Sequence, residues 1–155
     1  MSREILFKGK RIDNGEWVEG YLFGDGIIGS NRMFIGELTI EDYKGNADDG
    51  PTIITGSYYS EVDPETVCQY TGLTDKNDRK IFEGDILQID TENLTKNDGY
   101  FTVEWSEPGC CFVLCGNKYL AHFDNIYKDF REVIGNIFND LELLKDRQQP
   151  ESPIT

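Results

Sequence analysis

Polar residues at alternate positions from Asp75 onward resemble the start of a calcium-binding EF-hand loop. Asp75, Asn77 and Arg79 occupy its first, third and fifth positions. Such a loop also needs glycine at the sixth position and glutamate at the twelfth. Those positions hold Lys80 and Ile86, and Arg79 places a cation among the ligands. We therefore exclude a calcium loop of this kind.

Three cysteines and the only histidine fall within one short segment: Cys110, Cys111, Cys115 and His122. The paired C-x-x-C spacing of zinc sites is absent. Neighbouring residues of a strand point to opposite faces, so Cys110 and Cys111 should diverge, while Cys111 and Cys115 could share a face. We interpret the cysteines as packed residues of a strand pair and His122 as a packed or edge residue, and we expect no metal and no cofactor.

Glu83 and Asp85 are the carboxylate pair best suited to catalysis, because in an extended segment they would share one face. A solvent-exposed strand face would have the same pattern. The sequence contains no G-x-S-x-G elbow, phosphate-binding P-loop or G-x-G-x-x-G fingerprint. No catalytic set emerges, and a hydrolase that uses acidic residues stays open as an alternative.

The charge balance is strongly acidic along the whole chain. In 155 residues, 29 Asp and Glu stand against 15 Lys and Arg, giving a formal net charge of −14. Without a basic block, direct binding to nucleic acid is not expected, because phosphate neutralisation supplies most of that affinity. The excess charge promotes solubility. A sharper alternative is that the acidic surface mimics nucleic acid and blocks a host DNA-binding protein.

The compartment is predicted from the lack of targeting features. No apolar run approaches the roughly 20 residues that span a bilayer. The start of the chain is charged and lacks the apolar core of a signal peptide. We therefore expect a cytoplasmic protein without membrane contact, in which the cysteines are reduced.

Apolar residues recur mainly with a period of two, interrupted by Gly, Asn and Asp, which predicts many short antiparallel strands. The expected strands are 16–23, 27–28 paired with 33–35 around a turn at 29–32, 52–55, 57–59, 85–90, 100–105, 111–115 paired with 118–123, and 131–138. The last of these fits a helix as well, but its glycine and β-branched residues favour a strand. A loop is expected at 41–51 and a helical turn at 141–144.

The predicted fold class is mainly β, a β-rich α+β arrangement with a small SH3-like barrel in the C-terminal half. Residues 1–74 would form a β-rich segment that packs on or extends the barrel. Residues 75–144 would contain the barrel, and 145–155 a flexible polar tail. In 100–105, Phe101, Val103 and Trp105 should face one side of their strand.

Three segments, in order, carry a family resemblance. The first comprises Arg3-Glu4-Ile5, Lys8-Gly9-Lys10-Arg11 and Gly15-Glu16-Trp17-Val18. The second comprises Val62-Asp63-Pro64-Glu65-Thr66-Val67, Gln69-Tyr70-Thr71-Gly72-Leu73, Asp75-Lys76-Asn77 and Ile81-Phe82-Glu83-Gly84-Asp85-Ile86. The third comprises Val133-Ile134-Gly135-Asn136-Ile137-Phe138 and Leu141-Glu142-Leu143-Leu144. Together they resemble the YopX-like family of phage and prophage proteins.

The resemblance implies a fold and an origin in phages or prophages of Gram-positive bacteria, with no activity assigned. Its motif residues, read as structural or interface positions, are Tyr70, Gly72, Leu73, Asp75, Phe82, Glu83, Gly84, Asp85, Gly135 and Asn136. We expect Gly72 and Gly84 to supply positive φ angles, and Tyr70 and Phe82 to be core or interface anchors. Two residues depart from the family: Asp78 replaces a frequent glycine, and Asp140 a common proline, which should loosen the final turn.

The function predicted from these features is an accessory protein of a phage or prophage that acts by protein–protein contacts. Exposed aromatic residues and edge strands favour self-association, so we expect a homo-oligomer. Other protein partners are not identified by the sequence.

Overall fold

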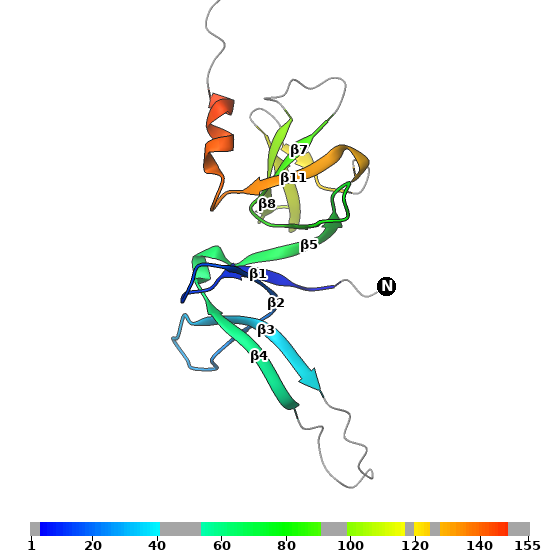
Figure 1. Ribbon diagram of the computed structural model, residues 1–155. Helices are drawn as coiled ribbons and strands as arrows, with labels where there is room; N and C mark the ends of the chain where they lie inside the picture. The colour runs from blue at the N-terminus through cyan, green and yellow to red at the C-terminus, as the bar shows by residue number, and fades with distance from the viewer. Residues whose placement is uncertain (1–3, 41–53, 91–98, 117–119, 125–127, 149–155) are drawn as a thin grey trace, which may run out of the picture. The chain divides into compact units, whose positions relative to one another are not determined.

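The computed structural model describes residues 4–40, 54–90, 99–116, 120–124 and 128–148, and within them the chain is mainly antiparallel β (Figure 1). It divides into two compact units. We call Ile5–Val67 the N-terminal unit and the chain from Cys68 onward the C-terminal unit. The loop predicted at 41–51 lies outside the described residues. The domain boundary that we predicted after residue 74 stays a prediction.

The N-terminal unit is an antiparallel meander whose strands lie in the order β4-β3-β2-β1. Its strands are β1 (Phe7–Lys10), β2 (Trp17–Gly24), β3 (Met33–Ile40) and β4 (Ile54–Val62), followed by the short 3-10 helix η1 (Pro64–Thr66). Arg11, just after β1, forms a bridge with Val62 at the end of β4, so the meander curls back on itself at one end. Leu6, Ile35 and Val62 are buried inside this curl.

Gly36 allows β3 and β4 to approach closely in this meander. A Cβ at Gly36 would lie 2.0 Å from the carbonyl oxygen of Tyr58 and 2.6 Å from the Cα of Tyr59. Both are backbone atoms of β4, so no side-chain rotation could make room. Only glycine fits at this crossing point.

The predicted strand at Ile27 and Ile28 is wrong. The partner of β3 is β2, in which Phe23 pairs with Phe34, and Ile27 and Ile28 lie exposed in the connecting turn. The Asp25 carboxylate accepts hydrogen bonds from the Ile27 N–H at 2.9 Å and from the Ser30 hydroxyl at 2.7 Å. An aspartate whose side chain accepts hydrogen bonds from its own turn ends the preceding strand. The apolar character of Ile27 and Ile28 gave no indication that they belong to such a turn.

The C-terminal unit is built on a five-stranded sheet of order β10-β9-β8-β7-β11. Its elements are β5 (Cys68–Thr74), β6 (Lys80–Phe82), β7 (Asp85–Ile89), β8 (Tyr100–Ser106), β9 (Cys111–Cys115), β10 (Leu120–His122), η2 (Lys128–Phe130), β11 (Arg131–Asn136) and η3 (Leu141–Gln148). The β5–β6 hairpin is tied to this sheet by backbone hydrogen bonds such as that from Lys76 N–H to the Arg131 carbonyl, 3.0 Å. The strands expected within 85–90, 100–105, 111–115, 118–123 and 131–138 are confirmed.

No strand pairing closes the five-stranded sheet among the described residues, where β10 and β11 form its two edges. The SH3-like barrel therefore stays a prediction, while the mainly β class is confirmed. The helical turn predicted at 141–144 is the start of η3, which continues to Gln148, inside the predicted tail. In the part of the chain that the structure describes, no helix has the length and apolar character needed to cross a membrane.

The core of the C-terminal unit lies between the hairpin and the sheet. Its buried cluster comprises Ile81, Leu87, Ile89, Phe101, Val103, Leu114 and Val133. Phe101 and Val103 thus face inward together, as the alternation predicted. Trp105, further along the same strand, is 41% exposed and packs edge-on against Phe112, with ring centroids 5.2 Å apart. The core ends before this tryptophan.

Candidate protein-contact surface

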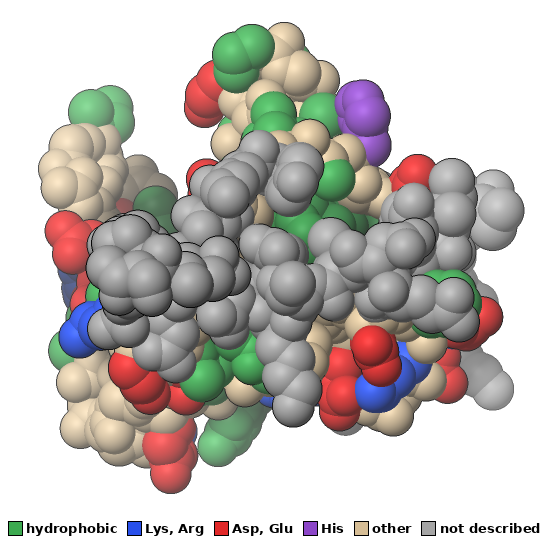
Figure 2. Space-filling model, turned by 90° about the horizontal axis from the view of Figure 1, so that it is seen from above, with side chains coloured by type: hydrophobic (Ala, Val, Ile, Leu, Met, Phe, Trp, Pro, Cys, Tyr) green, Lys and Arg blue, Asp and Glu red, His purple; other side chains and the backbone are tan. Residues whose placement is uncertain are grey.

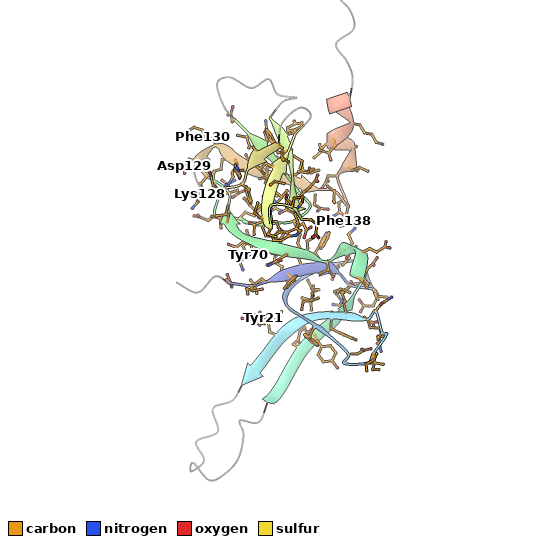
Figure 3. All side chains as sticks on the ribbon, turned by 180° about the vertical axis from the view of Figure 1, so that it is seen from behind. Tyr21, Tyr70, Lys128, Asp129, Phe130 and Phe138 are labelled. Carbon is orange, nitrogen blue, oxygen red and sulfur yellow. The ribbon has the colours of Figure 1, made fainter. Side chains whose placement is uncertain are left out.

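One outer face of the N-terminal meander is aromatic. Phe23 of β2 pairs with Phe34 of β3, while Gly36 of β3 lies between Tyr21 and Tyr59 of the flanking strands. Directly paired residues point to the same side of a sheet, so the four aromatic side chains share one side. We call Tyr21, Phe23, Phe34 and Tyr59 the aromatic face. Tyr21 can be located on β2 in Figure 3.

Three rings of the aromatic face contact one another, and the face remains partly open to solvent. Phe23 stacks on Phe34 with centroids 5.9 Å apart, and Tyr59 meets both edge-on at 5.8 and 5.7 Å. Gly36 beneath them carries no side chain. Tyr21 is 55% and Tyr59 54% exposed. Contacting aromatic groups with this exposure are typical of protein interaction sites.

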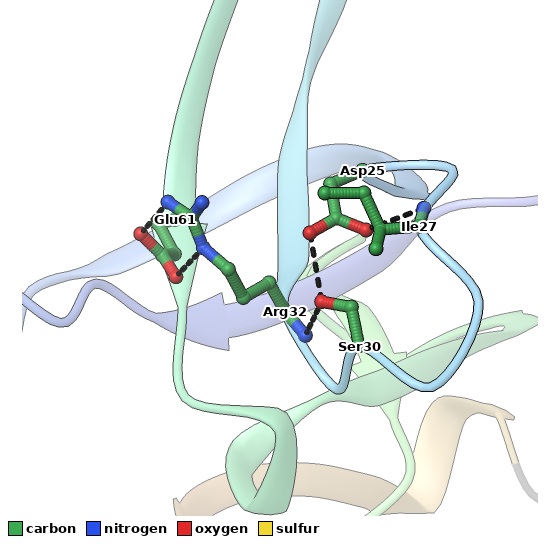
Figure 4. A network of polar contacts seen from close by, with 5 residues as sticks. All are labelled: Asp25, Ile27, Ser30, Arg32 and Glu61. Atoms are coloured by element: carbon green, nitrogen blue, oxygen red, sulfur yellow. Dashed lines mark hydrogen bonds and ion pairs between the residues drawn. The ribbon is translucent and has the colours of Figure 1, made fainter.

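A network of charged residues borders the aromatic face (Figure 4). The Arg32 guanidinium lies 5.2 Å from the Phe34 ring and donates two hydrogen bonds of 2.8 Å to the Glu61 carboxylate. These hydrogen bonds lower the pKa of Glu61, and the Ile27 N–H and Ser30 hydroxyl lower that of Asp25. Both carboxylates are therefore ionised at neutral pH, and Arg32 balances one of them.

An open groove of about 700 Å³ begins at this border. Its lining residues are Leu22, Phe23, Gly24, Ser30, Asn31, Arg32, Met33, Asp63, Pro64 and Glu65. The groove continues the apolar surface from Phe23 towards Pro64 and places two acidic side chains at its far end.

The family-motif residues, in contrast, belong to the C-terminal unit, and most support its fold. Tyr70 and Phe82 pair across β5 and β6, are buried, and have ring centroids 5.5 Å apart. Of the two roles predicted for Tyr70 and Phe82, core or interface anchor, their burial fits the core. Gly72 and Gly84 have φ angles of 86° and 78°, which confirms the predicted left-handed conformation. Leu73 is half-buried on β5.

Asp75 is fully buried and acts as a cap for two segments. Its carboxylate accepts backbone N–H hydrogen bonds from Asn77 at 2.8 Å, Arg79 at 2.9 Å and Val133 at 3.1 Å. The first two close the 75–79 turn, and the third joins it to β11. Asp78 in this turn has a φ of 60°, so it adopts the conformation of the glycine that it replaces.

Arg131 is a buried cation that the sequence gave no reason to single out. Its guanidinium donates to the Thr74 carbonyl at 3.1 and 2.8 Å and to the Asp124 carbonyl, and it lies 4.9 Å from the Phe123 ring. Burial lowers the pKa of Arg131, but an arginine stays charged at neutral pH. It joins the end of β5 to the chain before β11.

Glu83 and Asp85 do not lie on one strand face. Glu83 and Gly84 form the tight turn between β6 and β7, so the extended segment required for a carboxylate pair is absent. The Asp85 carboxylate is buried and accepts a hydrogen bond from the Phe82 N–H at 2.8 Å. The Asp85 carboxylate therefore caps the turn. The hydrolase alternative loses the carboxylate pair of Glu83 and Asp85 on which it was based.

Replacing Glu83 with Gln is expected to raise stability at neutral pH. Burial of this carboxyl raises its pKa, the Gln69 N–H lowers it, and nearby Glu104 raises it. Because the net shift is upward, ionisation destabilises the fold as pH rises from about 4.3 through the folded pKa. Thermal unfolding at about pH 4 and pH 7 should show the gain of Glu83→Gln mainly at pH 7. A variant less stable than the parent at pH 7 would contradict this assignment.

Gly135 and Asn136 close the end of β11. The Asn136 side-chain oxygen accepts from the N–H groups of Phe138 at 3.0 Å and Asn139 at 3.1 Å. The Asp140 carboxylate accepts from the Asn136 N–H at 3.0 Å and lies beside Gly135, where a Cβ would be 2.6 Å away. The Asp140 carboxylate thus provides an acceptor within this turn, while the expected loosening relative to proline stays a prediction.

Cys110, Cys111, Cys115 and His122 lie in the turn before β9, on β9 and on β10. Cys110 is exposed, Cys111 and Cys115 lie on β9, and His122 is exposed on the edge strand β10, visible in purple in Figure 2. Among the described residues, no group of three or more His, Cys, Asp or Glu side chains could hold a metal ion.

The aromatic face is the feature that sequence reasoning missed. Alternation placed Tyr21 and Phe23 on one side of their strand, and this was the available signal. Which residues lie across from them depends on the register of β2, β3 and β4, which a single sequence does not reveal. The wrong pairing of Ile27 and Ile28 with β3 hid this face.

Comparisons with known proteins show the fold and, separately, the family. Among solved structures, the chain is similar to "Crystal structure of protein EF1440 from Enterococcus faecalis", with 21% identity and a TM-score of 0.52. The match covers 92% of this chain and 99% of that one, which shows a shared fold. The search of curated proteins gave no match. The family model described as "YopX protein" matches residues 30–145, most of the sequence, and the chain therefore belongs to the YopX family.

Proposed function

We propose that this chain is a phage or prophage accessory protein that acts through protein–protein contacts in the cytoplasm of a bacterial host. The aromatic face of the N-terminal unit is its contact surface, and a second copy of the chain is the partner. The carrying observation is the group of mutually packed but exposed rings around Gly36. Phage origin is supported by the family, and self-association by the chemistry of this face.

Covering the aromatic face would remove apolar surface from water. Each buried Å² of such surface contributes about 25 cal/mol, and tyrosine and phenylalanine are enriched in interfaces because they are large and rigid. Phe23, Phe34 and Tyr59 already restrict one another through stacked and edge-on contacts. Little side-chain entropy therefore remains to be lost on association.

A second copy is favoured as the partner by the local charge. Two chains of net charge −14 repel one another over most of their surface. Beside the aromatic face Arg32 is paired with Glu61, so this pair adds no net charge next to the rings. In a two-fold symmetric contact the same pair would come from both copies, and each Arg32 could face the Glu61 of the other.

Tyr59→Ser is expected to weaken self-association by about tenfold or more, since removing one central aromatic side chain typically costs over about 1.4 kcal/mol. The matched control is Tyr58→Ser. Tyr58 is the neighbouring residue, is 82% exposed, and points to the opposite face of β4. Sedimentation equilibrium over a concentration series gives the dissociation constant of each variant, and far-UV circular dichroism verifies folding.

Two results would reject this proposal. One is a parent protein that stays monomeric at high micromolar concentration. The other is an equal effect of Tyr58→Ser and Tyr59→Ser. An apolar contact should also survive high salt, because screening acts on exposed charges. A salt-sensitive complex with a basic DNA-binding host protein, unaffected by Tyr59→Ser, would instead favour the alternative that the acidic surface mimics nucleic acid.

A further inference from the structure

The β8–β9 connection places the first of two adjacent thiols in a tight turn and the second at the start of β9. β8 ends at Ser106 and β9 begins at Cys111, so Cys110 belongs to the turn and not to the strand. It has a φ of 47°, in the left-handed region, and its N–H donates to the Glu107 carbonyl at 3.3 Å. Cys110 therefore lies outside the strand, so strand alternation gives no reason for the two thiols to diverge.

Both sulfur atoms lie against the backbone of this turn. The Cys110 thiol donates to the Glu107 carbonyl at 3.4 Å. The Cys111 Sγ lies 3.1 Å from the position that a Cβ on Gly109 would occupy, so the glycine leaves space beside that thiol. Cys110 is exposed and Cys111 partly exposed, so both can be reached from solvent.

We propose that Cys110 and Cys111 form a vicinal dithiol site for a soft, thiophilic ion that binds two thiolates, of the trivalent arsenical class. Thiolates are soft ligands and select soft ions. The closed four-ligand site of structural zinc needs further ligands. Among the residues that the structure describes, no third His, Cys, Asp or Glu joins the pair.

The two remaining cysteines do not complete or compete for this site. Cys68 is buried. Cys115 is four residues along β9 from Cys111, a separation of about 13 Å at about 3.3 Å per strand residue. One arsenic or metal centre cannot bridge that distance, so only the adjacent pair can chelate.

The binding reaction with phenylarsine oxide requires no redox partner. Each thiol loses its proton and forms one bond to arsenic. The oxygen of the reagent leaves as water with the two protons. Arsenic remains trivalent and the sulfur atoms keep their oxidation state, so atoms and electrons balance. The same site would take other ions that accept two thiolates.

The test is intact-protein mass spectrometry of the reduced full-length chain with phenylarsine oxide in the presence of excess monothiol. One arsenical should bind and block two titratable thiols. Cys110→Ser and Cys111→Ser should each weaken binding by about a hundredfold or more, because the second bond of the chelate forms intramolecularly. Cys115→Ser, the matched control, should bind like the parent.

The outcomes are decisive whether or not the chain self-associates. Binding kept by Cys110→Ser, binding lost in Cys115→Ser, or failure of the folded parent to bind would each overturn the proposal. Release of the arsenical by a small dithiol, but not by a monothiol, would support chelation. Circular dichroism of each serine variant separates loss of the site from loss of the fold.

Discussion

Asp75→Asn is expected to lower the free energy of unfolding by about 3 kcal/mol. One carboxylate oxygen accepts the N–H groups of Asn77 and Arg79, and the other accepts that of Val133. Asparagine keeps only one of these oxygens and presents an NH₂ group in place of the other. A buried backbone N–H would then face a donor, and the link between the 75–79 turn and β11 would be lost. Urea unfolding at neutral pH measures this loss.

The loss should depend on pH in a defined direction. Burial raises the pKa of Asp75, but the three N–H donors and Arg79 outweigh it, and the net shift is downward. A carboxyl with a lowered folded pKa contributes stability above its unfolded pKa of about 3.9 and loses it as pH falls through the folded value. The difference between the parent and Asp75→Asn should therefore be full at neutral pH and shrink in acid.

Asp78→Asn is the matched control for the capping carboxylate. Asp78 belongs to the same turn, but its side chain is exposed and pairs with Lys128 at 2.8 Å. Exposed ion pairs contribute little, and asparagine tolerates the left-handed conformation of this position. If Asp78→Asn destabilised the protein as much as Asp75→Asn, general charge loss would be the cause and the capping role would be rejected.

Gly36→Ala is expected to unfold the N-terminal unit or to destabilise it by more than about 3 kcal/mol. The added Cβ would lie 2.0 Å from the Tyr58 carbonyl oxygen. Because the clash is with backbone, β3 and β4 would have to separate, and the aromatic face would be lost with them. Fluorescence of Trp17 in a Trp105→Phe background reports on this unit alone, because the sequence has only these two tryptophans.

Gly24→Ala provides the comparison for this substitution. The nearest atom to a Cβ at Gly24 is the Arg32 carbonyl oxygen at 3.8 Å, an ordinary contact. Alanine at such a site is neutral or mildly stabilising, since it restricts the unfolded chain. A Gly36→Ala protein with the unfolding midpoint of Gly24→Ala would show that β3 and β4 do not approach as closely as described.

Local patterns predicted the parts of the fold that depend on local chemistry. Alternation in 100–105 placed Phe101 and Val103 on one side of their strand, where both belong to the core, and the motif glycines Gly72 and Gly84 have the expected left-handed conformation. Hydrogen bonds between residues far apart in the sequence leave no such local pattern. The Asp75 carboxylate caps the N–H of Val133, a residue 58 positions away, and nothing near Asp75 encodes that distance.

The aromatic face could not be predicted from the sequence for a related reason. Alternation assigns Tyr21 and Phe23 to one side of a strand, but the same pattern would fit a buried side. Exposure is decided by what packs on that side, and this depends on the register between strands. The Asp25 turn is what fixes that register, and it looks like an ordinary polar interruption in the sequence.

The connectivity of the two units has a consequence for synthesis on the ribosome. In the N-terminal unit each strand pairs with the next, so its strand pairing and the contacts of β1 with the residues after β4 are complete once Val67 has emerged. The C-terminal unit must wait for β11, whose residues pair with β7 and receive the Asp75 cap. At about 5–20 residues per second, the first unit can fold seconds before the second can begin to close. During that interval the nascent chain already displays its aromatic face, so two neighbouring chains on one messenger could meet before either is finished.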